Sequence, residues 1–181
     1  TTYFPLHQYG LKLKFVDINK ETLNFDIQKL KDALTPSTKL IMAVNLLGNP
    51  NEYDKIYKLI ENKPISLIED NCESLGAKYN NKLTGTFGLC GSFSTFFSHH
   101  ISTMEGGLIS TDNQEIYEIL LSLRAHGWTR DLPQNNLVSG NKSSIDFNES
   151  FKFVLPGYNV RPLELSGAVG CEQLKKLDQF I

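Results

Sequence analysis

The sequence has few cysteines, and their arrangement excludes several kinds of protein. Only Cys72, Cys90 and Cys171 occur among the 181 residues. They form no C-x-x-C pair and leave an odd thiol, so we expect neither a disulfide framework nor a zinc site. Three thiolates also fall short of the four that hold a usual iron–sulfur cluster. A reducing cytoplasm is the expected location.

Strong charge and long apolar runs are absent too. The net charge of −2 provides no electrostatic footprint for nucleic acid or an anionic membrane. No apolar run reaches the roughly 18–20 residues that a membrane span needs. The start at Thr1 has no signal-peptide pattern and no initiator methionine, and the chain ends at Ile181 inside a helical pattern. We therefore expect residues 1–181 to be one truncated domain of a soluble protein.

Strand-like and helix-like segments alternate along the chain. Strands are predicted at residues 12–16, 40–44, 65–68, 91–97 and 107–110, and the apolar run 40–44 is typical of a strand buried on both faces. Helices are predicted from the N-cap Asp26 to Leu34, around residues 53–60, at residues 116–123 and from near Leu163. The polar segment 130–153 is expected to be a long loop. This alternation indicates an α/β domain with a mostly parallel sheet.

The first motif that could carry chemistry is Glu69–Glu73, at the end of a predicted strand. Ligands of parallel sheets bind at the carboxyl ends of strands, which makes Asp70 a candidate. A strand end capped by acids explains the motif equally well. A buried carboxylate is costly unless it is paired, so a functional Asp70 needs a cation such as a protonated heterocyclic nitrogen.

The second motif, residues 91–107, combines small hydroxyl residues, glycines and the adjacent His99 and His100. Such a segment can offer hydroxyl and backbone N–H donors to a phosphate, and an imidazole can give or take a proton near neutral pH. A surface loop with incidental histidines is the alternative. A zinc site is disfavoured, because no Cys, Asp or Glu stands at ligand spacing.

Two further motifs are only partly explained by ordinary structure. In residues 124–128, a helix stop accounts for Arg124 and Gly127 but not for His126. In residues 156–162, a turn that leads into a helix accounts for the prolines and the glycine but not for Asn159 or Arg161.

Taken together, in this order and spacing, the four motifs resemble the DegT/DnrJ/EryC1/StrS sugar aminotransferase family of fold-type-I pyridoxal-phosphate enzymes. The resemblance covers essentially the whole chain. It implies the large domain of that fold, a mostly parallel sheet flanked by helices, with the N-terminal start and a smaller C-terminal domain outside residues 1–181.

One position departs from the family pattern. The family lysine lies six residues before the glutamate of the E-G-G motif, and that position is His99. No lysine occurs between Lys82 and Lys142. A lysine amine forms the covalent link that transamination requires, and an imidazole cannot form it.

With histidine at this position, the chain resembles the branch of the family that removes the C3 hydroxyl of nucleotide-linked 4-keto-6-deoxyhexoses. Within that branch it is most similar to the enzymes that act on GDP-4-keto-6-deoxy-D-mannose. The resemblance implies pyridoxamine 5'-phosphate as cofactor and L-glutamate as the co-substrate that regenerates it from pyridoxal 5'-phosphate. His99 is then the acid/base that takes a proton from the cofactor and protonates the departing hydroxyl.

The resemblance also implies roles for other residues. Asp70 should pair with the pyridinium nitrogen, Ser94 should bind the cofactor phosphate, and His126 should line the site. Glu73 stands where relatives have Gln or His near the ring hydroxyl. Asn159 should reach the phosphate of the neighbouring subunit's cofactor, which implies a homodimer.

Three alternatives stay open at this point. A CDP-sugar 3-dehydrase shares the histidine but carries an iron–sulfur cluster on four cysteines. A relative without catalytic activity would keep the fold as a binding module, and an aminotransferase would need a lysine from elsewhere.

Overall fold

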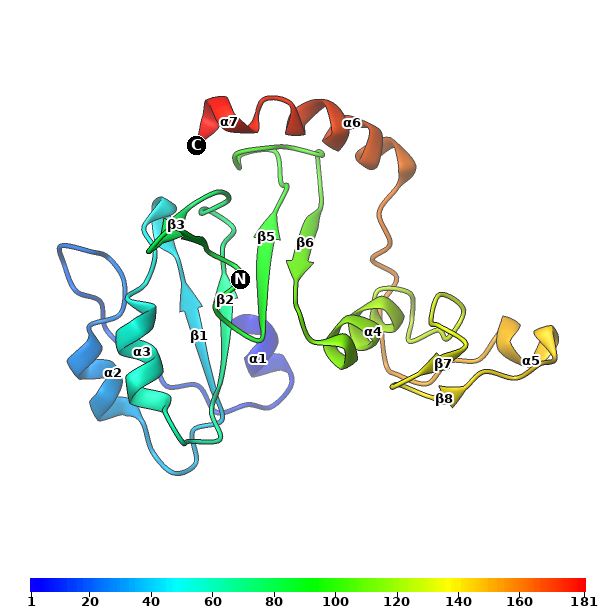
Figure 1. The fold of residues 1–181 in the computed structure, drawn as a ribbon, viewed down its shortest axis with the longest axis horizontal. Coiled ribbons are helices and arrows are strands. Elements are labelled where there is room, and N and C mark those ends of the chain that lie inside the picture. The colour runs from blue at the N-terminus through cyan, green and yellow to red at the C-terminus, as the bar shows by residue number, and fades with distance from the viewer. The chain divides into compact units, whose positions relative to one another are not determined.

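The computed structural model describes residues 1–181, which divide into two compact units (Figure 1). The first unit comprises Thr1–Ser110 together with Val169–Ile181, and the second comprises Thr111–Ala168. The predicted motifs are divided between them, because the first two lie in the first unit and the last two lie in the second.

A four-stranded sheet forms the centre of the first unit. Its order is β1 (Leu40–Val44), β2 (Ser66–Asp70), β5 (Cys90–Ser94) and β6 (Gly107–Ser110). β1, β2 and β5 run parallel, and β6 is antiparallel to β5. The sheet is therefore mostly parallel, and four of the five predicted strands occur.

The remaining elements of the first unit are short. They are α1 (Phe4–Gln8), α2 (Ile27–Ala33), the 3-10 turn η1 (Leu46–Gly48), α3 (Tyr53–Ile60), the hairpin strands β3 (Lys78–Tyr79) and β4 (Lys82–Leu83), and α7 (Leu177–Phe180). α6 (Glu164–Leu174) begins in the second unit and ends in the first. α2 starts where the sequence predicts, because the Asp26 carboxylate accepts the Lys29 N–H at 3.0 Å.

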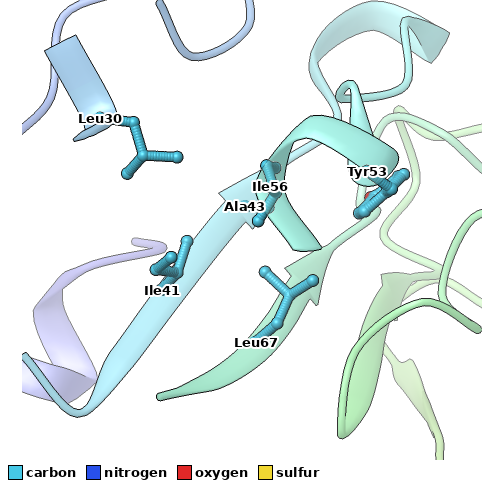
Figure 2. Packing of buried hydrophobic residues seen from close by; sticks show 6 residues of the cluster. All are labelled: Leu30, Ile41, Ala43, Tyr53, Ile56 and Leu67. Carbon is cyan, nitrogen blue, oxygen red and sulfur yellow. The ribbon is translucent and has the colours of Figure 1, made fainter. Parts of the chain in front are cut away.

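The hydrophobic core lies on one face of the sheet. α2 and α3 lie side by side next to β1 (Figure 1) and cover this face. The buried side chains come from both helices, β1 and β2 (Figure 2): Leu30, Ile41, Ala43, Tyr53, Ile56 and Leu67. The expectation that 40–44 is buried on both faces is wrong. Its other residues are only half-buried or, at Val44, exposed, because both helices pack on the same side.

Residues 12–16 do not form the predicted strand. Their backbone joins no ladder, and the segment ends at a single isolated bridge between Ile18 and Phe25. Val16 packs against the core while Phe15 is exposed. A strand requires a hydrogen-bonded partner, and β1, at the edge of the sheet, pairs only with β2.

The second unit shows more structure than the predicted loop. It contains α4 (Gln114–Leu123), as predicted, and then the hairpin strands β7 (Asn135–Asn136) and β8 (Gly140–Asn141) and the helix α5 (Asp146–Ser150). Two buried carboxylates organise this polar segment. Glu118 accepts the Leu137 N–H at 2.6 Å, and Glu149 accepts the Ser143 N–H at 2.8 Å. Hydrogen bonds of this kind produce no periodic pattern of apolar residues, so the sequence does not reveal them.

The carboxylate of Glu69, in β2, accepts four hydrogen bonds within the first unit. It is 1% exposed and accepts the Tyr53 hydroxyl at 2.8 Å. It also accepts three backbone N–H groups at 2.6–2.7 Å, those of Gly85, Phe87 and Gly88. Burial and this carboxylate raise the pKa of Tyr53. Glu69 therefore fixes the 85–88 turn against β2.

Asn45 extends this polar cluster past the end of β1. Its amide donates to the Asn71 side chain at 2.7 Å and to the Tyr53 hydroxyl at 2.6 Å. Its carbonyl oxygen accepts the backbone N–H of Asn51 at 2.9 Å, and the Ser74 hydroxyl donates to its backbone carbonyl. The loops that leave β1 and β2 are thus tied together immediately beside Asp70.

Glu69→Gln should lower the free energy of unfolding by about 3 kcal/mol, because an amide offers only one oxygen to four donors and brings its own N–H to face one of them. Urea unfolding of the intact protein measures this. Glu61→Gln, at an exposed position, is the matched control and should change stability by less than about 0.5 kcal/mol. Equal effects of the two substitutions would contradict the structural role of Glu69.

Candidate active site

Asp70 is the last residue of β2, at the carboxyl end of the parallel strands. Side chains alternate along a strand, so Asp70 points to the face opposite Glu69. It pairs with Val44 and Ser92 in register. The core helices do not cover this face, yet Asp70 is only 7% exposed.

Hydrogen bonds hold both oxygens of the Asp70 carboxylate. The Thr2 hydroxyl donates to Oδ2 at 2.6 Å, and the Cys72 N–H donates to Oδ1 at 3.1 Å. None of the four ion pairs of the structure includes Asp70. The chain thus presents a nearly buried carboxylate that has hydrogen-bond donors but no cation.

Cys72 lies against this carboxylate. Burial, and then its hydrogen bond to Asp70, raise the pKa of its thiol to about 12. The thiol is therefore protonated at neutral pH and is a poor nucleophile or metal ligand.

Ser94 ends β5, the strand next to β2. Ser94 is two residues after Ser92, which pairs with Asp70 in register. Since side chains alternate along a strand, the Ser94 side chain lies on the same face of the sheet as Asp70. Its Oγ accepts the Phe96 N–H at 3.1 Å, which starts the following loop. The residue is half-buried, and its hydroxyl keeps its proton available to donate to a ligand.

His99 lies on the loop that follows Ser94. The loop is closed at its base, where the hydroxyls of Thr95 and Thr103 are 2.6 Å apart and the Thr95 N–H donates to the Gly106 carbonyl at 3.0 Å. The His99 N–H donates to the Phe96 carbonyl at 3.0 Å, and the two rings meet edge to face at 6.2 Å. His99 is half-buried, so its imidazole keeps access to a ligand.

Glu73 contacts the turn that follows β1. Its Oε2 accepts the Leu47 N–H at 3.2 Å, and Leu47 has a positive φ of 52°. Few leucines adopt this conformation, and the hydrogen bond stabilises it.

His126 and Asn159 lie together in the second unit. The segments that carry them pair through a bridge between Ala125 and Asn159, and the His126 N–H donates to the Tyr158 carbonyl at 3.0 Å. Gly127 permits the close approach of the Leu155 backbone, because a Cβ there would be 1.7 Å from the Leu155 carbonyl oxygen. The side chains of His126 and Asn159 are both exposed.

The structure thus brings Asp70 and Ser94 to one face of a sheet, places His99 on the adjoining loop and pairs the two motifs of the second unit. Two neighbours of Asp70 were missed in the sequence. Ser92 could have been found, because it alternates with Ser94. Thr2 could not, since 68 residues separate it from Asp70.

No group of three or more His, Cys, Asp or Glu side chains in residues 1–181 is arranged to hold a metal ion. None of the helices is long and apolar enough to cross a membrane.

The chain belongs to the DegT/DnrJ/EryC1/StrS aminotransferase family, whose pattern matches residues 1–181. It is 67% identical over 181 residues to the GDP-4-keto-6-deoxy-D-mannose 3-dehydratase of Escherichia coli O55:H7, covering 100% of this chain and 47% of that protein. A protein of the same name from Yersinia pseudotuberculosis is 66% identical over 100% of this chain and 46% of its own length.

A solved structure shows the same likeness. It is a GDP-4-keto-6-deoxymannose-3-dehydratase with a trapped PLP-glutamate geminal diamine, with a TM-score of 0.96 at 66% identity over 98% of this chain and 46% of that chain. The predicted family and fold class are therefore confirmed. The chain spans about half the length of the curated relatives it matches.

The contact between Cys72 and Asp70 predicts that the Cys72 thiol is alkylated slowly. A pKa raised from 9.0 to about 12 lowers the thiolate fraction about a thousandfold, and the greater nucleophilicity of a more basic thiolate offsets part of this. Alkylation of Cys72 at pH 8, followed by mass spectrometry, should be roughly thirtyfold slower in the folded protein without cofactor than in urea.

The exposed Cys171 is the internal control and should react at similar rates in both states. Asp70→Asn should speed up the reaction of folded Cys72, because it removes the negative charge that disfavours the thiolate. A rate unchanged by Asp70→Asn would show that the carboxylate does not act on this thiol.

Proposed function

We propose that the chain is the large, cofactor-binding domain of a pyridoxamine-phosphate-dependent 3-dehydratase of nucleotide-linked 4-keto-6-deoxyhexoses. The observation that carries the proposal is the Asp70 carboxylate, nearly buried at the carboxyl end of β2 and without a cation of the protein. The N-terminal start and the smaller C-terminal domain of the enzyme lie outside residues 1–181.

The residues present fit this cofactor. Asp70 would pair with the protonated ring nitrogen, which supplies the cation that a buried carboxylate needs. The Ser94 hydroxyl would donate to the phosphate, and Glu73 would lie near the ring hydroxyl. His126 would line the site, as the family resemblance implies. When bound, the cofactor would supply an electron sink for the carbon that loses a proton.

His99 is the acid/base of the proposed reaction. It stands at the position of the family lysine, six residues before Glu105, and it cannot link covalently to the cofactor as an amine does. An imidazole can accept a proton from the cofactor and then donate one to the C3 hydroxyl as that group departs as water. The chain therefore keeps proton transfer and loses transamination of the sugar.

The proposed substrate is GDP-4-keto-6-deoxy-D-mannose, with L-glutamate as the co-substrate that restores the amine form of the cofactor. Two relatives at 66–67% identity are named for dehydration of this sugar nucleotide, and a solved relative holds a PLP-glutamate adduct. The product class is a 3-deoxy-4-keto sugar for deoxysugar and lipopolysaccharide O-antigen biosynthesis, such as colitose.

We also propose a homodimer in the cytoplasm. The Asn159 side chain is exposed, and the Arg161 Nε–H donates to its Oδ1 at 3.1 Å. Its amide N–H groups are therefore free to reach the phosphate of the neighbouring subunit's cofactor.

The second candidate is a CDP-sugar 3-dehydrase, which shares the histidine but requires an iron–sulfur cluster. Cys72, Cys90 and Cys171 are free thiols and are one short of a four-cysteine set. Iron analysis of the intact protein separates the two enzymes, because the GDP-sugar enzyme is expected to bind none.

His99→Asn should leave cofactor binding intact and lower kcat by at least about a hundredfold, because it removes the group that transfers protons. Ammonia release from the keto-sugar with L-glutamate present measures kcat, and absorbance of bound cofactor measures binding. His100→Asn is the matched control and should keep kcat within about threefold. A larger loss of kcat in His100→Asn than in His99→Asn would show that His100, and not His99, is the acid/base.

His99→Lys should link covalently to pyridoxal phosphate, which borohydride reduction detects, and should lose the dehydration activity.

The substrate assignment is tested with the intact protein, L-glutamate and the GDP-, CDP- and dTDP-linked 4-keto-6-deoxyhexoses. Mass spectrometry should detect loss of the C3 oxygen with the highest kcat/KM for the GDP-linked sugar. Turnover of the CDP-linked sugar alone would favour the second candidate. Turnover of none, with cofactor bound, would favour a binding module.

A further inference from the structure

We propose that Thr2 is a positioning residue for Asp70, whose hydroxyl fixes the carboxylate in the orientation that pairs with the cofactor's ring nitrogen. This inference rests on the proposed function and names a residue for which the sequence motifs imply no role.

The two oxygens of Asp70 are held from two distant parts of the chain. Cys72, two residues away, donates its backbone N–H to Oδ1 at 3.1 Å. Thr2, 68 residues away, donates its hydroxyl to Oδ2 at 2.6 Å. The second distance is that of a strong, charge-assisted O–H···O⁻ hydrogen bond.

One of these contacts alone would leave the carboxylate free to turn. The terminal torsion of aspartate is broad, so a single donor at Oδ1 permits many carboxylate planes. A second donor at Oδ2, from a segment outside β2, selects one of them. A carboxylate offers about four lone-pair sites, so both oxygens keep a site for a cationic N–H.

Neighbouring groups do not replace Thr2. The Ser92 hydroxyl, beside Asp70 in register, donates at 3.4 Å to the Glu69 backbone carbonyl instead. The Cys72 thiol is half-buried against the same carboxylate but is a weak donor. Thr2 therefore supplies the one hydroxyl that holds Asp70.

The test uses Thr2→Val, which keeps the shape and removes the donor, and Thr2→Ser, which keeps the donor. Both are made in the intact protein with pyridoxamine phosphate labelled with ¹⁵N in the ring. Two quantities are measured, namely the Kd of the cofactor and the ¹⁵N chemical shift of the bound ring, which reports whether that nitrogen is protonated. Thr1→Val, at an exposed neighbouring position, is the matched control.

Thr2→Val should raise Kd about tenfold, the loss expected of one hydrogen bond to a charged group. It should also move the ring ¹⁵N shift towards the unprotonated value. Thr2→Ser and Thr1→Val should stay within about twofold of wild type. In an Asp70→Asn background, Thr2→Val should change neither quantity further.

A Thr2→Val protein with the Kd and ¹⁵N shift of wild type would overturn the inference. So would an equally large effect in the Asp70→Asn background, because Thr2 would then act on something other than Asp70. Should Thr2→Val not fold, Thr2→Ala carries the same expectations. Failure of the cofactor-binding role on which the inference rests gives a different result, since the wild-type protein would then bind no cofactor.

Discussion

The carboxylate of Glu69 is the constraint on which the described site depends. An ionised side chain without a counter-ion is expensive to bury, and Glu69 is accommodated because Tyr53 and three backbone N–H groups donate to it. The 85–88 turn must therefore fold around the end of β2. Because side chains alternate along a strand, the register that buries Glu69 on the helix side presents Asp70 on the opposite face.

The adjacent residues Glu69 and Asp70 therefore have different functions. Glu69 is saturated with donors from the protein and holds the fold, while Asp70 has two donors, no cation and a position at the carboxyl end of parallel strands. The family scaffold accounts for this arrangement, and the chemistry depends on what stands beside it. With histidine instead of lysine at position 99, the proposed chemistry is proton transfer without a covalent tether.

The sequence predicts the regular parts of the molecule well and the polar parts poorly. β1, β2, α3 and α4 fall within one or two residues of their predicted bounds, because apolar spacing determines them. Residues 12–16 were wrongly assigned, since the sequence does not show whether a ladder partner exists. Residues 135–150 fold around Glu118 and Glu149, and such contacts have no periodic signal. Family and fold class are confirmed, whereas the roles of Asp70, Ser94, His99 and Asn159 stay predictions, and Thr2 is visible only in three dimensions.

A crystal structure of the intact protein with pyridoxamine phosphate would show directly whether Asp70 and His99 have these roles. We expect one Asp70 carboxylate oxygen within about 3 Å of the pyridine nitrogen and the His99 imidazole facing the carbon that bears the cofactor's amine. A ring bound away from the carboxyl end of β2, or an imidazole turned away from the ring, would show that these roles are wrong.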